Sequence, residues 1–89
     1  MASQQNIIGA QVRFLRQQKK LSQETLAAHC NLLGWDISRG TLSKIEASLR
    51  RVNDAEVMLL SKALKCTVPD LYPTKDTELL LSVARQGRE

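Results

Sequence analysis

Apolar residues recur at intervals of three and four along most of the chain, and they never alternate with polar residues for long enough to indicate a strand. Ile8, Val12 and Leu15 are the first to show this spacing, which places side chains on one face of an α-helix. Glycine and proline together account for only 6 of 89 residues, too few for a disordered chain. The sequence therefore predicts one all-α domain.

Capping residues indicate where the helices begin and end. The first helix is expected over 6–18. Ser22 and Ser38 are N-cap candidates for helices over 22–31 and 39–47, and Gly34 suits the left-handed residue that ends a helix. The remaining expectations are a helix from Asn53 to about Lys65 with Glu56 completing a capping box, a short helix from Thr67 to Pro73, and a sixth over 76–86.

The apolar stripes of these helices predict a compact bundle of five helices, or six if the last one forms. Trp35 is expected to pack over the turn before residue 39. Cys30 and Cys66 lie in apolar helical patterns and are interpreted as buried thiols, with a disulfide or a regulatory thiol as the alternatives. The other expected core residues are Leu26, Ala27, Leu42, Ile45, Val57, Leu60, Ala63 and Leu64.

Helix 39–47 is unusual in its polar residues. Its apolar positions are Leu42 and Ile45, and the other positions up to residue 44 are small or basic and include no acid. A solvated helix usually mixes charges of both signs, so this composition indicates an acceptor-rich partner. The major groove of DNA admits one α-helix and presents base acceptors that arginine and lysine can reach.

Two runs of sequence carry a family resemblance. The first run is Leu21-Ser22-Gln23-Glu24-Thr25-Leu26-Ala27, and the second is Ser38-Arg39-Gly40-Thr41-Leu42-Ser43-Lys44-Ile45-Glu46. Together they resemble the Cro and phage-repressor type of helix-turn-helix, the Xre-like regulators. The similarity continues through 59–64 and 67–72, so it covers roughly residues 7–72. It implies a lambda-repressor-like fold and binding to double-stranded DNA.

The resemblance also implies roles for individual residues. Glu46 matches an acidic residue that is usually structural. The expected base contacts are Arg39, Gly40, Thr41 and Lys44. Phosphate contacts are expected from Gln23, Ser43, Arg13, Arg16, Arg50 and Arg51, the last two lying in the loop after the recognition helix.

Two features depart from the family pattern. The connection between the two helices is about five residues longer than usual, which requires either a longer second helix or a bulge around Trp35. The glycine that commonly follows the glutamate is replaced by Ala47-Ser48. Both departures bear on the angle at which the recognition helix would meet DNA.

The distribution of charge supports the same reading. The chain has a net charge of +4. Residues 1–23 contain four basic residues and no acid, and residues 37–53 contain four basic residues and one acid, so these two segments carry +7 and the rest carries −3. Basic residues gathered on such segments favour a phosphate-binding face over an ordinary solvated one.

Several classes of protein are not supported. The sequence shows no nucleophile motif, no acid–base set and no phosphate-binding glycine loop, so an enzyme is not expected. His29 with two distant cysteines cannot supply a zinc site, and no cofactor is expected. No apolar run is long enough to span a membrane, and Met1 to Gln5 lacks the features of a signal peptide, so a cytoplasmic protein is expected.

We therefore expect a sequence-specific transcriptional regulator, acting as a repressor through helix 39–47 in the major groove. Residues 1–75 would form the DNA-binding domain. Residues 76–89 would serve either in dimerisation on a two-fold operator or in capping the core. Two alternatives stay open: a protein-interaction or antitoxin-like accessory module on the same fold, and the DNA-binding part of a larger ligand-sensing regulator. The intact Met1 favours a stand-alone protein, and any effector is unknown.

Overall fold

The described residues form six helices in succession, so the sixth helix that the sequence left open is present. The computed structural model describes residues 4–73 and 77–86, and it contains no strand within these ranges. The expected domain boundary at 75/76 and the chain end at 87–89 lie outside the described residues. The helices are α1 (Gly9–Gln18), α2 (Gln23–Leu32), α3 (Arg39–Glu46), α4 (Asp54–Leu64), α5 (Val68–Leu71) and α6 (Thr77–Gln86).

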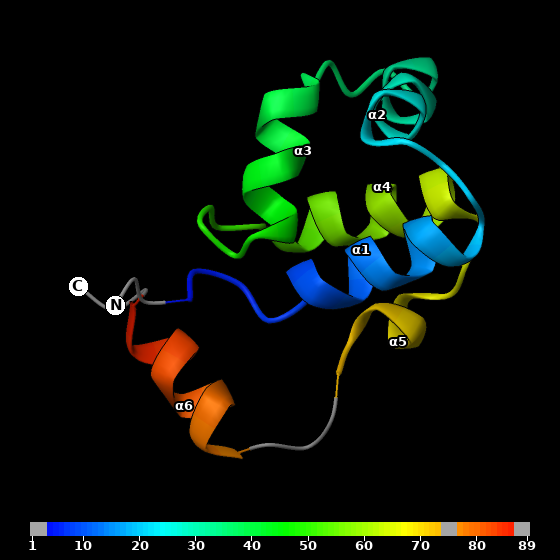
Figure 1. Cartoon of the computed structure of the whole chain (residues 1–89). Coiled ribbons are helices and arrows are strands. Elements are labelled where there is room, and N and C mark those ends of the chain that lie inside the picture. The colour runs from blue at the N-terminus through cyan, green and yellow to red at the C-terminus, as the bar shows by residue number, and fades with distance from the viewer. Residues whose placement is uncertain (1–3, 74–76, 87–89) are drawn as a thin grey trace.

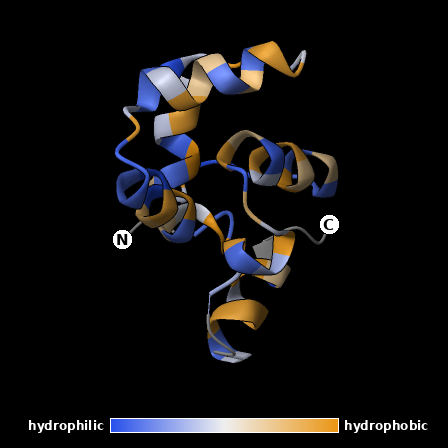
Figure 2. Ribbon diagram, turned by 90° about the vertical axis from the view of Figure 1, so that its right-hand side faces the viewer, coloured by the Kyte–Doolittle hydropathy of each residue, from blue (hydrophilic) through white to orange (hydrophobic). Residues whose placement is uncertain are grey.

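Helices α1 to α5 pack around one core, and α6 lies at its edge (Figure 1), where Val83 lines a pocket together with Ile8, Val57 and Tyr72. α1 lies beside α4, and α3 packs against both α1 and α2. Figure 2 shows hydrophobic and hydrophilic residues interspersed along the helices, as expected for helices with one buried face. Nine side chains are essentially inaccessible: Ile8, Val12, Leu26, Cys30, Leu42, Ile45, Leu60, Leu64 and Leu71.

All the core residues expected in the second, third and fourth helices are buried. Burial raises the pKa of the Cys30 thiol to about 11, and Cys66 is half-buried. Both cysteines are unpaired thiols. Trp35 is partly buried against the core, and His29 Nδ1 lies 3.3 Å from the Ala63 carbonyl oxygen.

The predicted caps are present at four helices. The side chains of Ser22 and Ser38 accept hydrogen bonds from the backbone N–H groups of Thr25 and Thr41. Asn53 and Glu56 form the expected capping box on α4, and Thr67 and Asp70 form one on α5. These caps satisfy backbone donors that would otherwise lack a partner at the helix starts.

The first helix begins later than predicted. Residues 6–8 were expected to be helical, but Asn6 Oδ1 accepts hydrogen bonds from the N–H groups of Ile8 at 3.1 Å and Gly9 at 2.7 Å, and regular helix starts at Gly9. The Asn6 side chain thus satisfies two backbone donors just before the regular helix, and such local hydrogen bonds compete with helical conformation at residues 6–8. The apolar spacing gave no sign of this, because Ile8 is buried either way.

Three of the described helices end through a non-glycine residue with left-handed backbone. These residues are Lys20 (φ 59°), Ser48 (φ 61°) and Lys65 (φ 56°), none of them glycine. In each case the next residue's N–H reaches back to a carbonyl in the last turn, as when Leu49 donates to Lys44 at 2.9 Å. This is the Schellman ending, which turns the chain sharply away from the helix axis.

Candidate nucleic-acid interface

The turn between α2 and α3 is built from Gly34 and Asn31. Gly34 adopts φ 96°, and the N–H of Trp35 donates to the Cys30 carbonyl at 3.0 Å, so α2 ends in a Schellman turn. Asn31 Nδ2 then donates to the Ile37 carbonyl at 3.0 Å, and the Ile37 side chain is buried. α2 ends at Leu32, within one residue of the expected end, so the extra length lies in the connection over 33–38, which contains Trp35.

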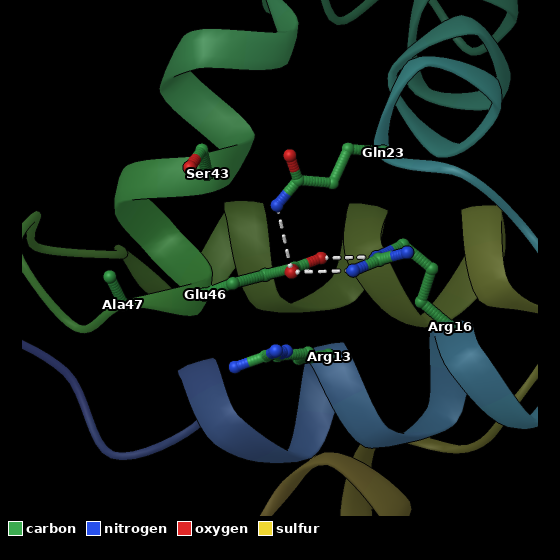
Figure 3. A pocket seen from close by; sticks show the side chains of 6 residues that line it. All are labelled: Arg13, Arg16, Gln23, Ser43, Glu46 and Ala47. Carbon is green, nitrogen blue, oxygen red and sulfur yellow. Dashed lines mark hydrogen bonds and ion pairs between the residues drawn. The ribbon is translucent and has the colours of Figure 1, made fainter.

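A hydrogen-bonded ion pair joins α1 to the recognition helix. Arg16 Nε donates to Glu46 Oε2 at 2.7 Å and Arg16 Nη2 donates to Oε1 at 3.0 Å. Gln23 Nε2, from the first turn of α2, donates to the same Oε1 at 3.0 Å. Figure 3 shows the three side chains converging from three helices. Because the Glu46 side chain is only 3% exposed, its charge is neutralised inside the protein rather than presented to a partner.

This geometry changes the role expected for Arg16. Its side chain is 10% exposed, its Nη1 donates to the Leu21 carbonyl at 2.7 Å, and its other hydrogen bonds go to Glu46. The hydrogen bond that Arg16 donates to Glu46 raises the pKa of Arg16, although burial opposes this. We therefore assign Arg16 to the positioning of α3 and α2 rather than to a direct phosphate contact. Helical spacing agrees with this role, because Arg16 follows the buried Val12 by four residues and so lies about 40° from it around the axis of α1.

The C-terminal end of α3 is held by two residues that the sequence gave no reason to select. Asn6 Nδ2 donates to the Ile45 carbonyl at 3.1 Å and to the Arg50 carbonyl at 2.8 Å. Gly9 lies so close to α3 that a Cβ added there would sit 2.2 Å from the Ile45 carbonyl oxygen. α1 can approach α3 this closely only because residue 9 has no side chain.

The outward face of α3 is basic. Leu42, Ile45 and Glu46 face inward, while Arg39, Gly40 and Lys44 are exposed. Among the described residues, neither Arg39 nor Lys44 takes part in an ion pair. Thr41 and Ser43 are half-buried at the edges of this face. The helix thus presents cationic side chains while its only acid is enclosed.

A shallow depression lies beside this face, between α1, α2 and α3. It measures about 290 Å³. Arg13 is exposed at its edge and forms no ion pair within the described part of the chain. The structure thus brings together four of the expected phosphate contacts with the Glu46 carboxylate behind them (Figure 3). The lining residues are Arg13, Arg16, Gln23, Ser43, Glu46 and Ala47.

The two arginines after α3 differ in their surroundings. Arg50 forms two hydrogen bonds of 3.0 Å with the Glu56 carboxylate, and its Nη1 donates to the Arg51 carbonyl at 2.8 Å. These hydrogen bonds raise the pKa of Arg50 and lower the pKa of Glu56. Arg50 therefore orders the loop between α3 and α4, and Arg51 is exposed on that loop. In the sequence, Glu56 is recognisable only as a member of the capping box, and nothing there indicates its ion pair with Arg50.

Within residues 4–73 and 77–86, His, Cys, Asp and Glu side chains form no group of three or more that could hold a metal ion. No helix in the described ranges is long and apolar enough to cross a membrane.

The helix-turn-helix family model matches residues 12–71. The chain belongs to this helix-turn-helix family. The match spans α2, α3 and the helices that support them, so it agrees with the resemblance seen in the sequence. The chain is a DNA-binding transcriptional regulator of the Xre-like kind, and this is not a family of enzymes. No curated protein sequence matches the chain.

Solved structures agree with this membership. The restriction-modification controller protein C.AhdI from Aeromonas hydrophila is 31% identical, with a TM-score of 0.65, over 73% of this chain and 91% of that one. The hypothetical transcription factor NHTF from Neisseria is 22% identical, with a TM-score of 0.67, over 88% and 84%. The clp gene regulator ClgR from C. glutamicum is 20% identical, with a TM-score of 0.64, over 99% and 97%. The last two show the shared fold.

Proposed function

We propose that this regulator reads a specific DNA sequence by placing α3 in the major groove. The observation that carries the proposal is the charge of α3: Arg39 and Lys44 point outward without a partner among the described residues, whereas Glu46 is buried and paired. A single helix fits the major groove, and the N-terminal residues of a recognition helix contact base edges. Arg39, Gly40, Thr41 and Lys44 are the proposed base-contacting positions.

Phosphate contacts come from the residues around this helix. Arg13, Gln23 and Ser43 line the depression beside α3, and Arg51 is exposed on the loop that follows it. Such contacts set the register and much of the affinity without reading sequence. Arg50 supports the same loop through Glu56, and its side chain, 32% exposed, remains within reach of a phosphate.

A second copy of the chain completes the proposed complex. One recognition helix covers a small site, and a dimer on a two-fold operator would place two such helices about 34 Å apart. α6 offers a surface for this contact, because Leu80 and Leu81 are 40% and 47% exposed. Residues 1–75 would then bind DNA and residues 76–89 would join the copies. We infer that the dimer bound in this way acts as a repressor in the cytoplasm.

The proposal is tested by measuring DNA affinity at several salt concentrations. Duplexes selected by the protein from a random pool supply the probe. Each phosphate contact should add about −0.9 to the slope of log K against log salt, so Arg13→Gln should reduce the slope by about that amount. A slope near zero for the unmodified protein would contradict the proposal and would favour a protein-interaction module that uses the exposed leucines of α6.

Arg39 provides the test of sequence reading. If Arg39 contacts a guanine through two hydrogen bonds, Arg39→Ala should reduce discrimination between the selected site and its single-base variants by about 1–3 kcal/mol. Arg51→Ala is the matched comparison, because a phosphate contact should weaken binding to all these duplexes equally. Equal losses for Arg39→Ala on every duplex would reassign Arg39 to the phosphate backbone.

A further inference from the structure

The three glycines at 9, 34 and 40 are not alike. Gly9 is required by its contact with the Ile45 carbonyl, and Gly34 is required by its positive φ. Gly40 has neither constraint. Its φ is not in the left-handed region, and the nearest atom to an added Cβ would be Ser38 Oγ at 3.7 Å, an ordinary contact distance. The fold would therefore accept a side chain at residue 40, and a helix is more stable with alanine than with glycine.

Gly40 occupies the outermost line of the recognition helix. Successive residues of an α-helix are separated by about 100°, so Gly40 lies about 160° from Leu42 and about 140° from Ile45 around the helix axis. Both of those side chains are fully buried. Lys44, one turn further along, lies about 40° from Gly40. In the first turn of α3, the centre of the exposed face therefore carries no side chain, and the backbone itself is accessible.

The first turn of α3 also lacks the usual stabilising charge. α2, α4, α5 and α6 each carry an acid in the first turn, where it interacts favourably with the helix dipole, whereas α1 and α3 carry none. α3 begins with Arg39 instead. This end of α3 therefore combines a cation, a missing side chain and the positive end of the dipole, an arrangement that suits close approach to a surface rich in negative charge and acceptors.

We propose that Gly40 determines the depth at which α3 sits in the major groove, and hence which base edges Arg39 and Lys44 reach. This inference rests on the proposed placement of α3 on DNA. Glycine lets the backbone approach a ligand more closely than any other residue allows. A Cβ at residue 40 would project from the centre of the exposed face and hold the helix away from the bases. Glycine at residue 40 then permits close contact between α3 and DNA, although it makes the helix less stable than alanine would.

The test is Gly40→Ala, with thermal unfolding and DNA affinity measured on the same preparations. The variant should melt about 2–5 °C higher than the unmodified protein, because alanine favours the helix. Its affinity for the selected duplex should fall at least about fivefold, the low end of the effect of one disrupted base contact. A repeat selection from the random pool should return a changed site preference.

Ala55 supplies a control at the matching place in another helix. It is exposed and occupies the second position of α4, as Gly40 does in α3, and it lies between the acids Asp54 and Glu56. Ala55→Gly should lower the melting temperature without changing DNA affinity. If Gly40→Ala binds DNA as well as the unmodified protein does, the proposal about Gly40 is wrong. If the unmodified protein binds without salt dependence, the placement of α3 on DNA has failed instead.

Discussion

Arg16 and Glu46 form a buried ion pair that fixes the recognition helix to α1, with Arg16 Nε 2.7 Å from Glu46 Oε2. The two residues are 30 positions apart in the chain, and Gln23 of α2 donates to the same carboxylate. One carboxylate thus ties together the three helices whose relative positions decide where basic side chains meet DNA. The pair itself is enclosed, so its role in the proposed complex would be to position these helices rather than to contact DNA.

Removing one partner of this pair should be costly. Glu46→Leu leaves the Arg16 guanidinium buried without its anion, and breaking a buried pair in this way costs about 3–5 kcal/mol. Urea unfolding measures the loss. Arg16→Met combined with Glu46→Leu should be more stable than Glu46→Leu alone, because no unpaired charge then remains inside. A double variant no more stable than the single one would show that the two charges are not energetically coupled.

Gly9→Ala should destabilise the protein even though alanine favours helices. The added Cβ would overlap the Ile45 carbonyl oxygen, a backbone atom that can move only if α1 and α3 separate. Overpacking of this kind costs about 1–3 kcal/mol. Thermal unfolding provides the measurement. Ala10→Gly, at the next and exposed position, controls for helix propensity and should cost at most about 1 kcal/mol. A Gly9→Ala protein as stable as the original would mean that this close approach is not required.

Lys65→Gly should stabilise the protein. Lys65 is exposed and holds φ 56° at the end of α4, a conformation that costs a non-glycine residue about 1–2 kcal/mol. Glycine loses part of this gain through its greater freedom in the unfolded chain, which leaves a net gain of about 1 kcal/mol. Lys62→Gly, three residues earlier inside the helix, should have the opposite effect, a loss of about 1 kcal/mol. Urea unfolding of the two variants should therefore move in opposite directions.

Stability should fall in acid partly through Glu56. Hydrogen bonds from Arg50 lower the pKa of Glu56 below its ordinary value of 4.5, although burial opposes this. The carboxylate therefore contributes its full stabilisation above pH 4.5, and this contribution is lost as the pH falls through the lower pKa of the folded state. Urea midpoints measured below about pH 5 should decline less steeply for Glu56→Gln than for the unmodified protein.

Arg50→Met should flatten the same part of the pH profile, since it removes the cation that lowers the pKa of Glu56. Glu56→Gln removes the titrating carboxyl group and Arg50→Met removes its cationic partner, so both profiles should be flatter than that of the unmodified protein. A profile for Arg50→Met as steep as that of the unmodified protein would show that another carboxyl group is responsible for the acid sensitivity.

The apolar spacing and the capping residues determined the elements of this protein. Ser22 and Ser38 cap α2 and α3 as expected, Asn53 and Glu56 form their capping box, and Leu42 and Ile45 are buried. These features could be predicted because they depend on residues at most four positions apart, whose geometry is set by the helix itself. The family was recognisable for the same reason, since its motifs lie within α2 and α3.

Only the tertiary structure decided the contacts between distant segments. The pairing of Arg16 with Glu46, the hydrogen bonds from Asn6 to Ile45 and Arg50, and the closeness of Gly9 to α3 all join residues 30 or more positions apart. The spacing of Arg16 from Val12 places it beside the buried face of α1, but no local pattern identifies the carboxylate that it meets across the bundle, because that contact arises only when the helices pack. Packing therefore separated the basic residues into those that position the recognition helix and those that remain available to DNA.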